Sequence, residues 1–172
     1  TGTVLPTWSN VGGGPGLVYT INNSNPDSVT LKHGNTQQDL GGGQIIDAGI
    51  ENVLTFSRAS FSGVLANTDF SLGTLVILNG TTFNDSEATS ATLNLAVSLT
   101  QPIVAASTAS LNFTMVSTAN SSDRQASADS VTLQNPNTNV TVTANGITYT
   151  LQVSIVSSDS SNGFISGNTF YG

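Results

Sequence analysis

The stretch that most restricts the fold is the segment Asn139–Ile155, which reads NVTVTANGITYTLQVSI. The dipeptide Asn145-Gly146 stands at its centre, between two runs in which apolar and polar residues alternate. An Asn-Gly pair in such a setting is the strongest short-range signal for a two-residue β-hairpin turn. The segment therefore predicts two antiparallel strands joined at Asn145-Gly146.

Counting outward from this turn predicts which residues face each other. One face receives only apolar pairs, namely Ala144 with Ile147, Val142 with Tyr149 and Val140 with Leu151. The other face receives threonine pairs, namely Thr143 with Thr148 and Thr141 with Thr150. Because a slip of one residue would turn the apolar face into water, the register is strongly specified. We expect the apolar face to pack on the core.

The rest of the chain also has the pattern of strands. No stretch shows the 3.6-residue apolar period of a helix, and Gly or Asn breaks recur at short spacing. This pattern predicts an all-β fold, an antiparallel, jelly-roll-like β-sandwich of about ten strands with essentially no helix. Because the run Leu72–Leu78 lacks polar alternation, we expect it to be a central strand buried on both faces. In the segment Ala91–Leu99, by contrast, every second residue is apolar and most of the others are polar, which predicts a strand with one buried face.

The composition limits the classes of partner. With 172 residues, a single domain over 1–172 is the default. Charged residues make up 8% of the chain and the net charge is −7, which argues against binding to nucleic acid or to an anionic membrane. No apolar run approaches the roughly 20 residues of a membrane span. Ser, Thr, Asn and Gly replace the charges, so the surface is neutral and polar.

The ends and the absence of cysteine predict a location. The sequence starts at Thr1-Gly2 without an initiator Met or a leader, so we expect a mature extracellular or cell-surface protein whose signal peptide has been removed. Zero cysteine excludes disulfides, thiol catalysis and thiolate metal sites.

Several short segments, in order along the chain, carry a family resemblance. They are Thr7-Trp8-Ser9, Phe70–Leu75, Asn79-Gly80-Thr81, Gln101-Pro102, Ala128–Val131 and Gly146–Leu151. Together they resemble the choice-of-anchor K domain, an extracellular module near the C-terminal anchors of surface proteins. The resemblance implies a location and no established activity. Members continue past the region of Gly163-Phe164 into a further strand, so an open groove is expected where that strand is missing.

Catalytic residues are not expected. His33 is the only histidine, it stands beside Gly34 at a predicted strand end, and no G-x-S-x-G motif accompanies it. We interpret it as a solvated turn residue. The carboxylates are scattered, mostly in turns, and no pair stands out for glycoside hydrolysis. A hydrolase therefore remains only a remote alternative.

Calcium is the metal that the loops could hold, because it prefers oxygen ligands. Two groups of oxygen donors qualify. They are Asn84, Asp85 and Glu87 in one turn, and Asn120, Asp123 and Asp129 around another. Neither has EF-hand or RTX spacing, and Arg124 within the second group favours a plain ion pair. No other cofactor is predicted.

Two sets of residues suggest a ligand surface. The aromatic residues Trp8, Tyr19, Tyr149 and Tyr171 could stack on sugars if their rings are exposed. The threonine face of the hairpin (Thr141, Thr143, Thr148 and Thr150) could be a flat surface for ice or a polysaccharide. The simpler interpretations are that Trp8 closes an end of the sandwich and that threonine suits the wet side of a strand.

The first functional hypothesis is therefore a non-enzymatic extracellular subunit of a surface layer, sheath, adhesin or fibre. It would associate with its own copies through edge-strand pairing or through donated terminal strands. The candidate donors lie in the terminal segments 1–10 and 163–172, and the residues expected to make the contact are Thr3, Val4, Leu5, Phe164, Ile165, Phe170 and Tyr171. The alternative is a carbohydrate-binding or adhesive module of the cell surface.

Overall fold

The computed structural model describes residues 1–100, 103–118, 127–156 and 163–172. These residues form antiparallel sheets and contain no helix, so the predicted all-β class is confirmed. None of the described residues forms a helix that could cross a membrane. The described ranges contain fourteen strands where the sequence predicted about ten, because several strands of only three residues give too little alternation to be recognised.

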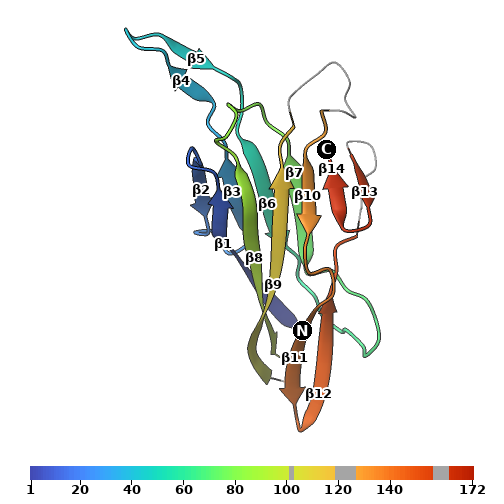
Figure 1. The fold of residues 1–172 in the computed structure, drawn as a ribbon. Helices are drawn as coiled ribbons and strands as arrows, with labels where there is room; N and C mark the ends of the chain where they lie inside the picture. The colour runs from blue at the N-terminus through green and yellow to red at the C-terminus, as the bar shows by residue number, and fades with distance from the viewer. Residues whose placement is uncertain (101–102, 119–126, 157–162) are drawn as a thin grey trace.

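Two sheets form the body of the molecule (Figure 1). Sheet A has six strands, in the order β1 (Gly2–Gly13), β8 (Ala88–Thr100), β9 (Ile103–Val116), β10 (Ser130–Leu133), β14 (Thr169–Tyr171) and β13 (Phe164–Ser166). Sheet B has four, in the order β2 (Tyr19–Asn22), β3 (Ser28–His33), β6 (Asn52–Arg58) and β7 (Gly73–Leu78). Two separate hairpins are formed by β4 (Gln37–Asp39) with β5 (Ile45–Asp47) and by β11 (Thr138–Ala144) with β12 (Ile147–Val153).

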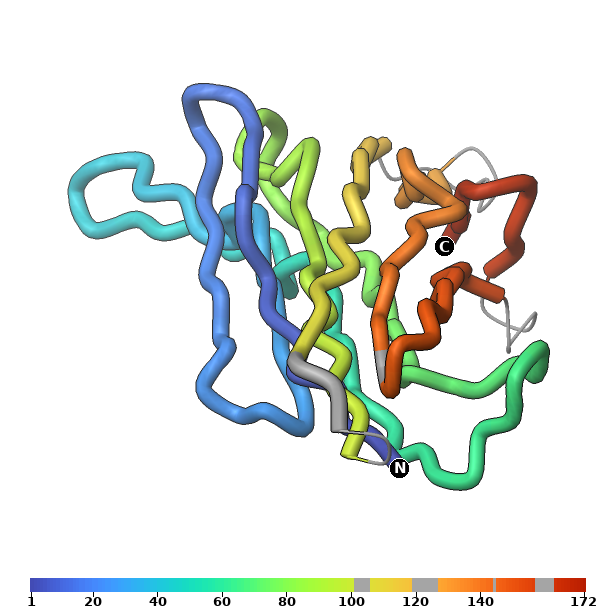
Figure 2. Tube along the Cα trace, turned by 90° about the horizontal axis from the view of Figure 1, so that it is seen from below, coloured from blue at the N-terminus to red at the C-terminus, as the bar shows by residue number. Residues whose placement is uncertain are grey.

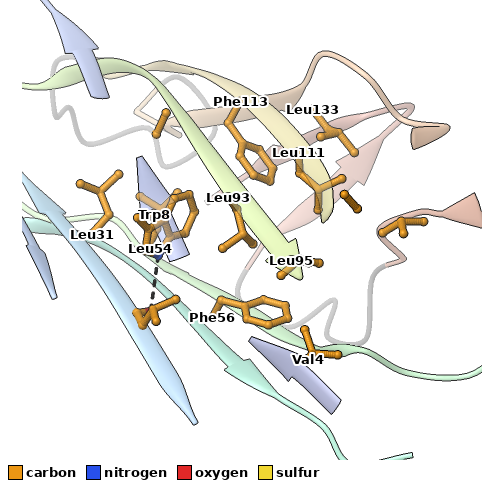
Figure 3. Packing of buried hydrophobic residues seen from close by; sticks show 14 of the residues in the cluster. Val4, Trp8, Leu31, Leu54, Phe56, Leu93, Leu95, Leu111, Phe113 and Leu133 are labelled. Carbon is orange, nitrogen blue, oxygen red and sulfur yellow. Dashed lines mark hydrogen bonds between the residues drawn. The ribbon is translucent and has the colours of Figure 1, made fainter. Parts of the chain in front are cut away.

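The core lies between the two sheets, where alternate residues of each strand point inward (Figure 3). Trp8 of β1 is 2% exposed, its ring lies 6.0 Å from that of Phe113, and its Nε1–H donates to the Val29 carbonyl at 3.4 Å. Leu31 and Leu54 meet these side chains from sheet B. The alternation predicted for Ala91–Leu99 is confirmed, because Ala91, Leu93, Leu95 and Val97 are buried between the layers. Leu99, at the end of this set, is partly buried.

Contacts between the sheets fix which edges lie together. β1 lies against β2, β3 and β6, so the β1 edge of sheet A is on the same side as the β2 edge of sheet B. At the opposite side, Asn79 Nδ2–H, just after β7, donates to the carbonyl of Gly172, just after β14, at 3.0 Å. In Figure 1, β10 passes in front of β7. The β7 edge therefore belongs to the side of β10, β14 and β13.

The hairpin β11–β12 has the register that its turn predicts. Ala144 pairs with Ile147, and the pairs continue regularly to Thr138 with Val153. Asn145 and Gly146 have φ angles of 53° and 75°, which is the left-handed conformation that a type I′ turn requires. All four threonines of the other face are exposed, as expected, and the Thr143 and Thr148 hydroxyls lie 3.2 Å apart.

The apolar face of this hairpin is only partly covered, which corrects the prediction. Val140 and Val142 on β11 are buried, but Ile147 and Tyr149 on β12 are 56% and 42% exposed. The reason is position: β11 lies along β9, where the Ser107 hydroxyl donates to the Thr141 carbonyl, whereas the tip of β12 lies outside the core. The hairpin extends from one end of the body in Figure 1.

The run Leu72–Leu78 is not a central strand, and that prediction is wrong. Its residues Gly73–Leu78 form β7, which among the described residues pairs only with β6 and ends the order of sheet B. Leu75 and Ile77 are half-buried, whereas Val76 and Leu78 are 56% and 47% exposed. A continuous apolar run does not distinguish a strand covered on both faces from an apolar edge strand.

Candidate functional site

The free edge of β7 is the first candidate site. Edge strands of soluble proteins usually carry a Lys, a Pro, an inward charge or a bulge that blocks pairing with another chain. The sequence of β7, GTLVIL, contains none of these residues, and its pairing with β6 is regular from Val53–Leu78 to Arg58–Gly73. This edge therefore offers unblocked backbone N–H and C=O groups beside exposed apolar side chains.

The inner side of the β13–β14 hairpin lies at the same side of the sandwich. Ile165 pairs with Phe170, and Phe170 pairs with Val131 of β10, so the three side chains point toward the same side. Val131 is buried, but Ile165 and Phe170 are only half-buried. Because sheet A has six strands and sheet B four, sheet A extends farther than its partner at this side.

Both predicted donor strands are paired within the chain. Thr3, Val4 and Leu5 belong to β1 and pair with Ser98, Val97 and Ala96 of β8. Val4 is fully buried, whereas Leu5 is 50% exposed. Phe164, Ile165, Phe170 and Tyr171 belong to the hairpin β13–β14, which completes sheet A beside β10. β1 therefore forms one edge of sheet A and the hairpin β13–β14 forms the other, on the opposite side of the molecule (Figure 2).

A polar crevice at one end of the sandwich brings parts of the two predicted calcium groups together. Asn84, Asp85 and Glu87 line it from the turn before β8, and Asp129 lines it from the residue before β10. Its volume is about 560 Å³. Asn120, Asp123 and Arg124 lie outside the described residues. Because the two groups are far apart in the sequence, the sequence did not indicate that Glu87 and Asp129 line the same crevice.

The carboxylates of this crevice already have protein partners. Asp129 accepts hydrogen bonds from the Thr118 N–H at 2.8 Å and from the Ser117 hydroxyl at 3.2 Å, while the Thr82 hydroxyl donates to Glu87 Oε1 at 2.6 Å. Burial raises the pKa of Asp129 above its ordinary value, and the hydrogen bonds from Thr118 and Ser117 partly oppose this shift. Within the described ranges, no three Asp, Glu or His side chains are grouped to hold a metal ion. Calcium binding here stays a prediction.

His33 is buried rather than solvated, which corrects the sequence interpretation. Its side chain is 4% exposed, and Nδ1 accepts a hydrogen bond from the Ala88 N–H at 3.2 Å. Burial lowers its pKa to about 4, against the opposing effect of Glu87 and Glu51. The imidazole is therefore neutral and joins the end of β3 to the start of β8.

The predicted aromatic platform does not exist as a single surface. Trp8 is in the core, Tyr19 is 47% exposed on β2 and Tyr149 is 42% exposed on β12. Tyr171 has a different partner, because its ring stacks on Phe164 with the centroids 4.7 Å apart and the planes 12° from parallel. Phe164 is 44% exposed.

The pairing of Phe164 with Tyr171 was missed in the sequence. Gly167-Asn168 joins β13 to β14 as a two-residue turn, and Gly167 has a φ angle of 59°. A Gly-Asn pair between two short apolar runs is a hairpin signal, so counting outward from it would have paired Ser166 with Thr169 and Phe164 with Tyr171.

No family model matches this chain, and no curated protein is similar to it. The resemblance to the choice-of-anchor K domain therefore stays a prediction.

Proposed function

We propose that this chain is a non-enzymatic structural module of an extracellular surface layer, sheath or fibre, and that its copies associate by pairing edge strands. The observation that carries the proposal is the unblocked apolar edge of β7, with Val76 and Leu78 exposed on the strand's outer side. A long-lived monomer normally protects such an edge, because any exposed strand can pair with it.

The sequence of β7 suits pairing with a second copy of itself. If two β7 strands meet antiparallel with Val76 opposite Val76, Leu75 of each copy lies opposite Ile77 of the other. Thr74 then lies opposite Leu78. Both faces of the joined sheet would carry apolar or β-branched pairs, the combinations that stabilise antiparallel strands. Such a contact is isologous and joins copies in pairs, so a layer, sheath or fibre would also need a second contact between these pairs.

The surroundings of the edge favour the same association. A strand added beside β7 would extend sheet B toward the side where Ile165 and Phe170 are half-buried. Covering these side chains would add hydrophobic stabilisation to the backbone hydrogen bonds. Because the terminal strands are paired within the chain, edge-to-edge pairing is the form of association that we favour over strand donation.

The test measures the size of the purified chain over a range of concentrations by size-exclusion chromatography with light scattering, and its form by electron microscopy. The Val76→Lys variant places a charge on the exposed side of the β7 edge and should remove the paired species. Lysine on an edge strand is the device by which natural sheets avoid pairing.

Thr20→Lys is the matched control, because it places the same charge on β2, the other edge of sheet B, where Thr20 is exposed. This variant should associate like the wild type. A chain that stays monomeric at every concentration, or a Val76→Lys variant that associates as the wild type does, would contradict the proposal.

A further inference from the structure

The six strands of sheet A contain no Asp, Glu, Lys, Arg or His. Among the described residues, these strands therefore give their outer face no charged side chain of its own, although the chain carries a net charge of −7. Asp129 stands just before β10, but its carboxylate bonds to Ser117 and Thr118. Water can be removed from a surface built by uncharged strands without leaving any ion on those strands unpaired.

The strand register arranges the outer side chains of sheet A in rows that cross the strands. One row of hydroxyl residues runs over five strands, in the order Ser166, Thr169, Thr132, Thr114 and Ser90. Adjacent members are spaced by the distance between strands, about 4.8 Å. Amide side chains stand nearby, with Gln134 Nε2–H donating to the Thr114 hydroxyl at 2.7 Å and the Thr92 hydroxyl donating to Asn112 Oδ1 at 3.1 Å.

An aromatic pair stands in the next row of the same face. The register places Phe164 opposite Tyr171, Tyr171 opposite Ser130 and Ser130 opposite Val116. The stacked rings of Phe164 and Tyr171 flank the hydroxyl row at the β13 edge. The 44% exposure of Phe164 leaves apolar ring surface open to a ligand.

These features fit one class of ligand. The C–H groups of a sugar ring carry partial positive charge and pack on the negative face of an aromatic ring. Sugar hydroxyls both donate and accept hydrogen bonds, as Ser, Thr, Asn and Gln do. A flat row of such groups beside an aromatic pair suits an extended chain of sugar units, and a face without charge suits a neutral one.

A second copy of the chain fits this face less well. Protein interfaces have a fully buried core enriched in aromatic, Met and Arg side chains. Among the described residues, the large apolar side chains exposed on this face are Leu5, Val116 and Phe164, which come from β1, β9 and β13. They are separated by polar positions, so they do not make a continuous apolar patch.

We infer that the outer face of sheet A, with Phe164 and Tyr171 as its aromatic anchor, binds a neutral polysaccharide. The inference is independent of the proposed self-association, because the face and the β7 edge belong to different sheets. It adds a ligand that the pairing of copies does not require.

The test is a depletion assay with microcrystalline cellulose, chitin and insoluble β-1,3-glucan as neutral probes and alginate as an anionic one. It uses the Val76→Lys background, so that association of copies does not contribute to retention. The expected result is saturable binding to at least one neutral probe that persists at high salt, since no ion pair is involved. Phe164→Ala should weaken this binding about tenfold, from the loss of one aromatic contact.

Tyr19→Ala is the matched control, because Tyr19 is an equally exposed aromatic residue on sheet B. It should bind like the parent. Thr114→Val, which removes a central hydroxyl and keeps a β-branched residue, should also weaken binding and covers the case in which Phe164→Ala unfolds the β13–β14 hairpin. Binding to alginate alone, binding to no neutral probe, or equal binding by the parent and by folded Phe164→Ala and Thr114→Val variants would overturn the inference.

Discussion

The two sheets of this sandwich carry different kinds of polar side chain outside the core. On the outer face of sheet B, Lys32 Nζ lies 3.1 Å from Glu51. At the end of β6, on the side that faces sheet A, Arg58 Nη2 lies 2.6 Å from Asp27. Sheet A uses neutral cross-strand contacts in their place, such as the hydroxyls of Thr132 and Thr169 at 2.9 Å. Both sheets share one hydrophobic core.

This difference assigns different contacts to the two sheets. Drying the outer face of sheet B would remove water from charged side chains, which is costly unless their pairing is perfect. Drying the outer face of sheet A would remove water only from hydroxyl and amide groups, which a neutral polymer can replace. Sheet B is therefore suited to contact through its backbone edge at β7, and sheet A through its face.

The largest expected effect tests whether the sheets depend on the same core. Trp8→Ala empties the centre of the sheet A side and should lower the free energy of unfolding by about 3–5 kcal/mol. Leu54→Ala, the corresponding cavity on the sheet B side, should lower it by about 2–5 kcal/mol. Urea unfolding followed by circular dichroism measures both, and each variant should unfold in a single transition. Two separate transitions would show that the sheets unfold independently.

The next largest effect is the pH dependence of the free energy of unfolding, which depends on His33 at the end of β3 in sheet B. His33 has a pKa of about 4 in the folded chain, whereas its ordinary value is 6.5. The unfolded chain therefore binds its proton first, and stability falls as the pH drops from about 6.5 to about 4. The loss should reach up to about 3 kcal/mol.

Asp129, at the end of sheet A, should act in the opposite sense. Because burial raises its pKa, its contribution to stability is lost as the pH rises through its folded value.

The difference between wild type and His33→Gln in urea unfolding at several pH values isolates the histidine. A difference that does not change between pH 4 and 7 would contradict the assigned burial of His33.

The structural features that depend only on residues close together in the sequence could be predicted. The type I′ turn at Asn145-Gly146 fixes the register of β11 and β12 without help from the rest of the chain. The same reasoning applied to Gly167-Asn168 would have paired Phe164 with Tyr171. Alternation along β8 likewise showed which of its residues are buried.

The parts that depend on distant packing were not predictable from the sequence. Whether Val76 is covered depends on the order of strands in sheet B, which no local pattern contains. The burial of His33 depends on Ala88, 55 residues away. The meeting of Glu87 and Asp129 in one crevice depends on the strand order of sheet A, where β8 and β10 begin at the same end on either side of β9. Each is a result of tertiary contacts between segments with similar local composition.

A smaller effect distinguishes charged contacts from neutral contacts by their response to salt. Arg58→Gln removes the ion pair with Asp27 and the hydrogen bond from Nη1 to the Val4 carbonyl at 3.2 Å. Asn94→Ala removes neutral contacts with Ser9 and Ser110, each at 2.8 Å. Each variant should lose about 1 kcal/mol at low salt.

The two losses should separate as the salt concentration rises. At about 1 M salt the Debye length is only about 3 Å, so the loss for Arg58→Gln should shrink while that for Asn94→Ala stays. Urea unfolding with and without sodium chloride gives both values. Equal salt dependence for the two variants would show that the sheets do not differ in this way.

The smallest effect on stability concerns the β7 edge, and its small size is what makes it informative. Val76 is 56% exposed and lies at the end of sheet B, so Val76→Lys should change the free energy of unfolding of the isolated chain by no more than about 0.5 kcal/mol. Thermal and urea unfolding at concentrations where the chain is monomeric measure this change.

If copies pair through β7, the same substitution should remove the concentration dependence of the wild-type melting temperature, because only the wild type gains stability by association. A large loss in the dilute monomer would instead show that Val76 is packed within its own molecule. The edge would then be a closed part of sheet B, and the contrast with the open face of sheet A would concern charge alone.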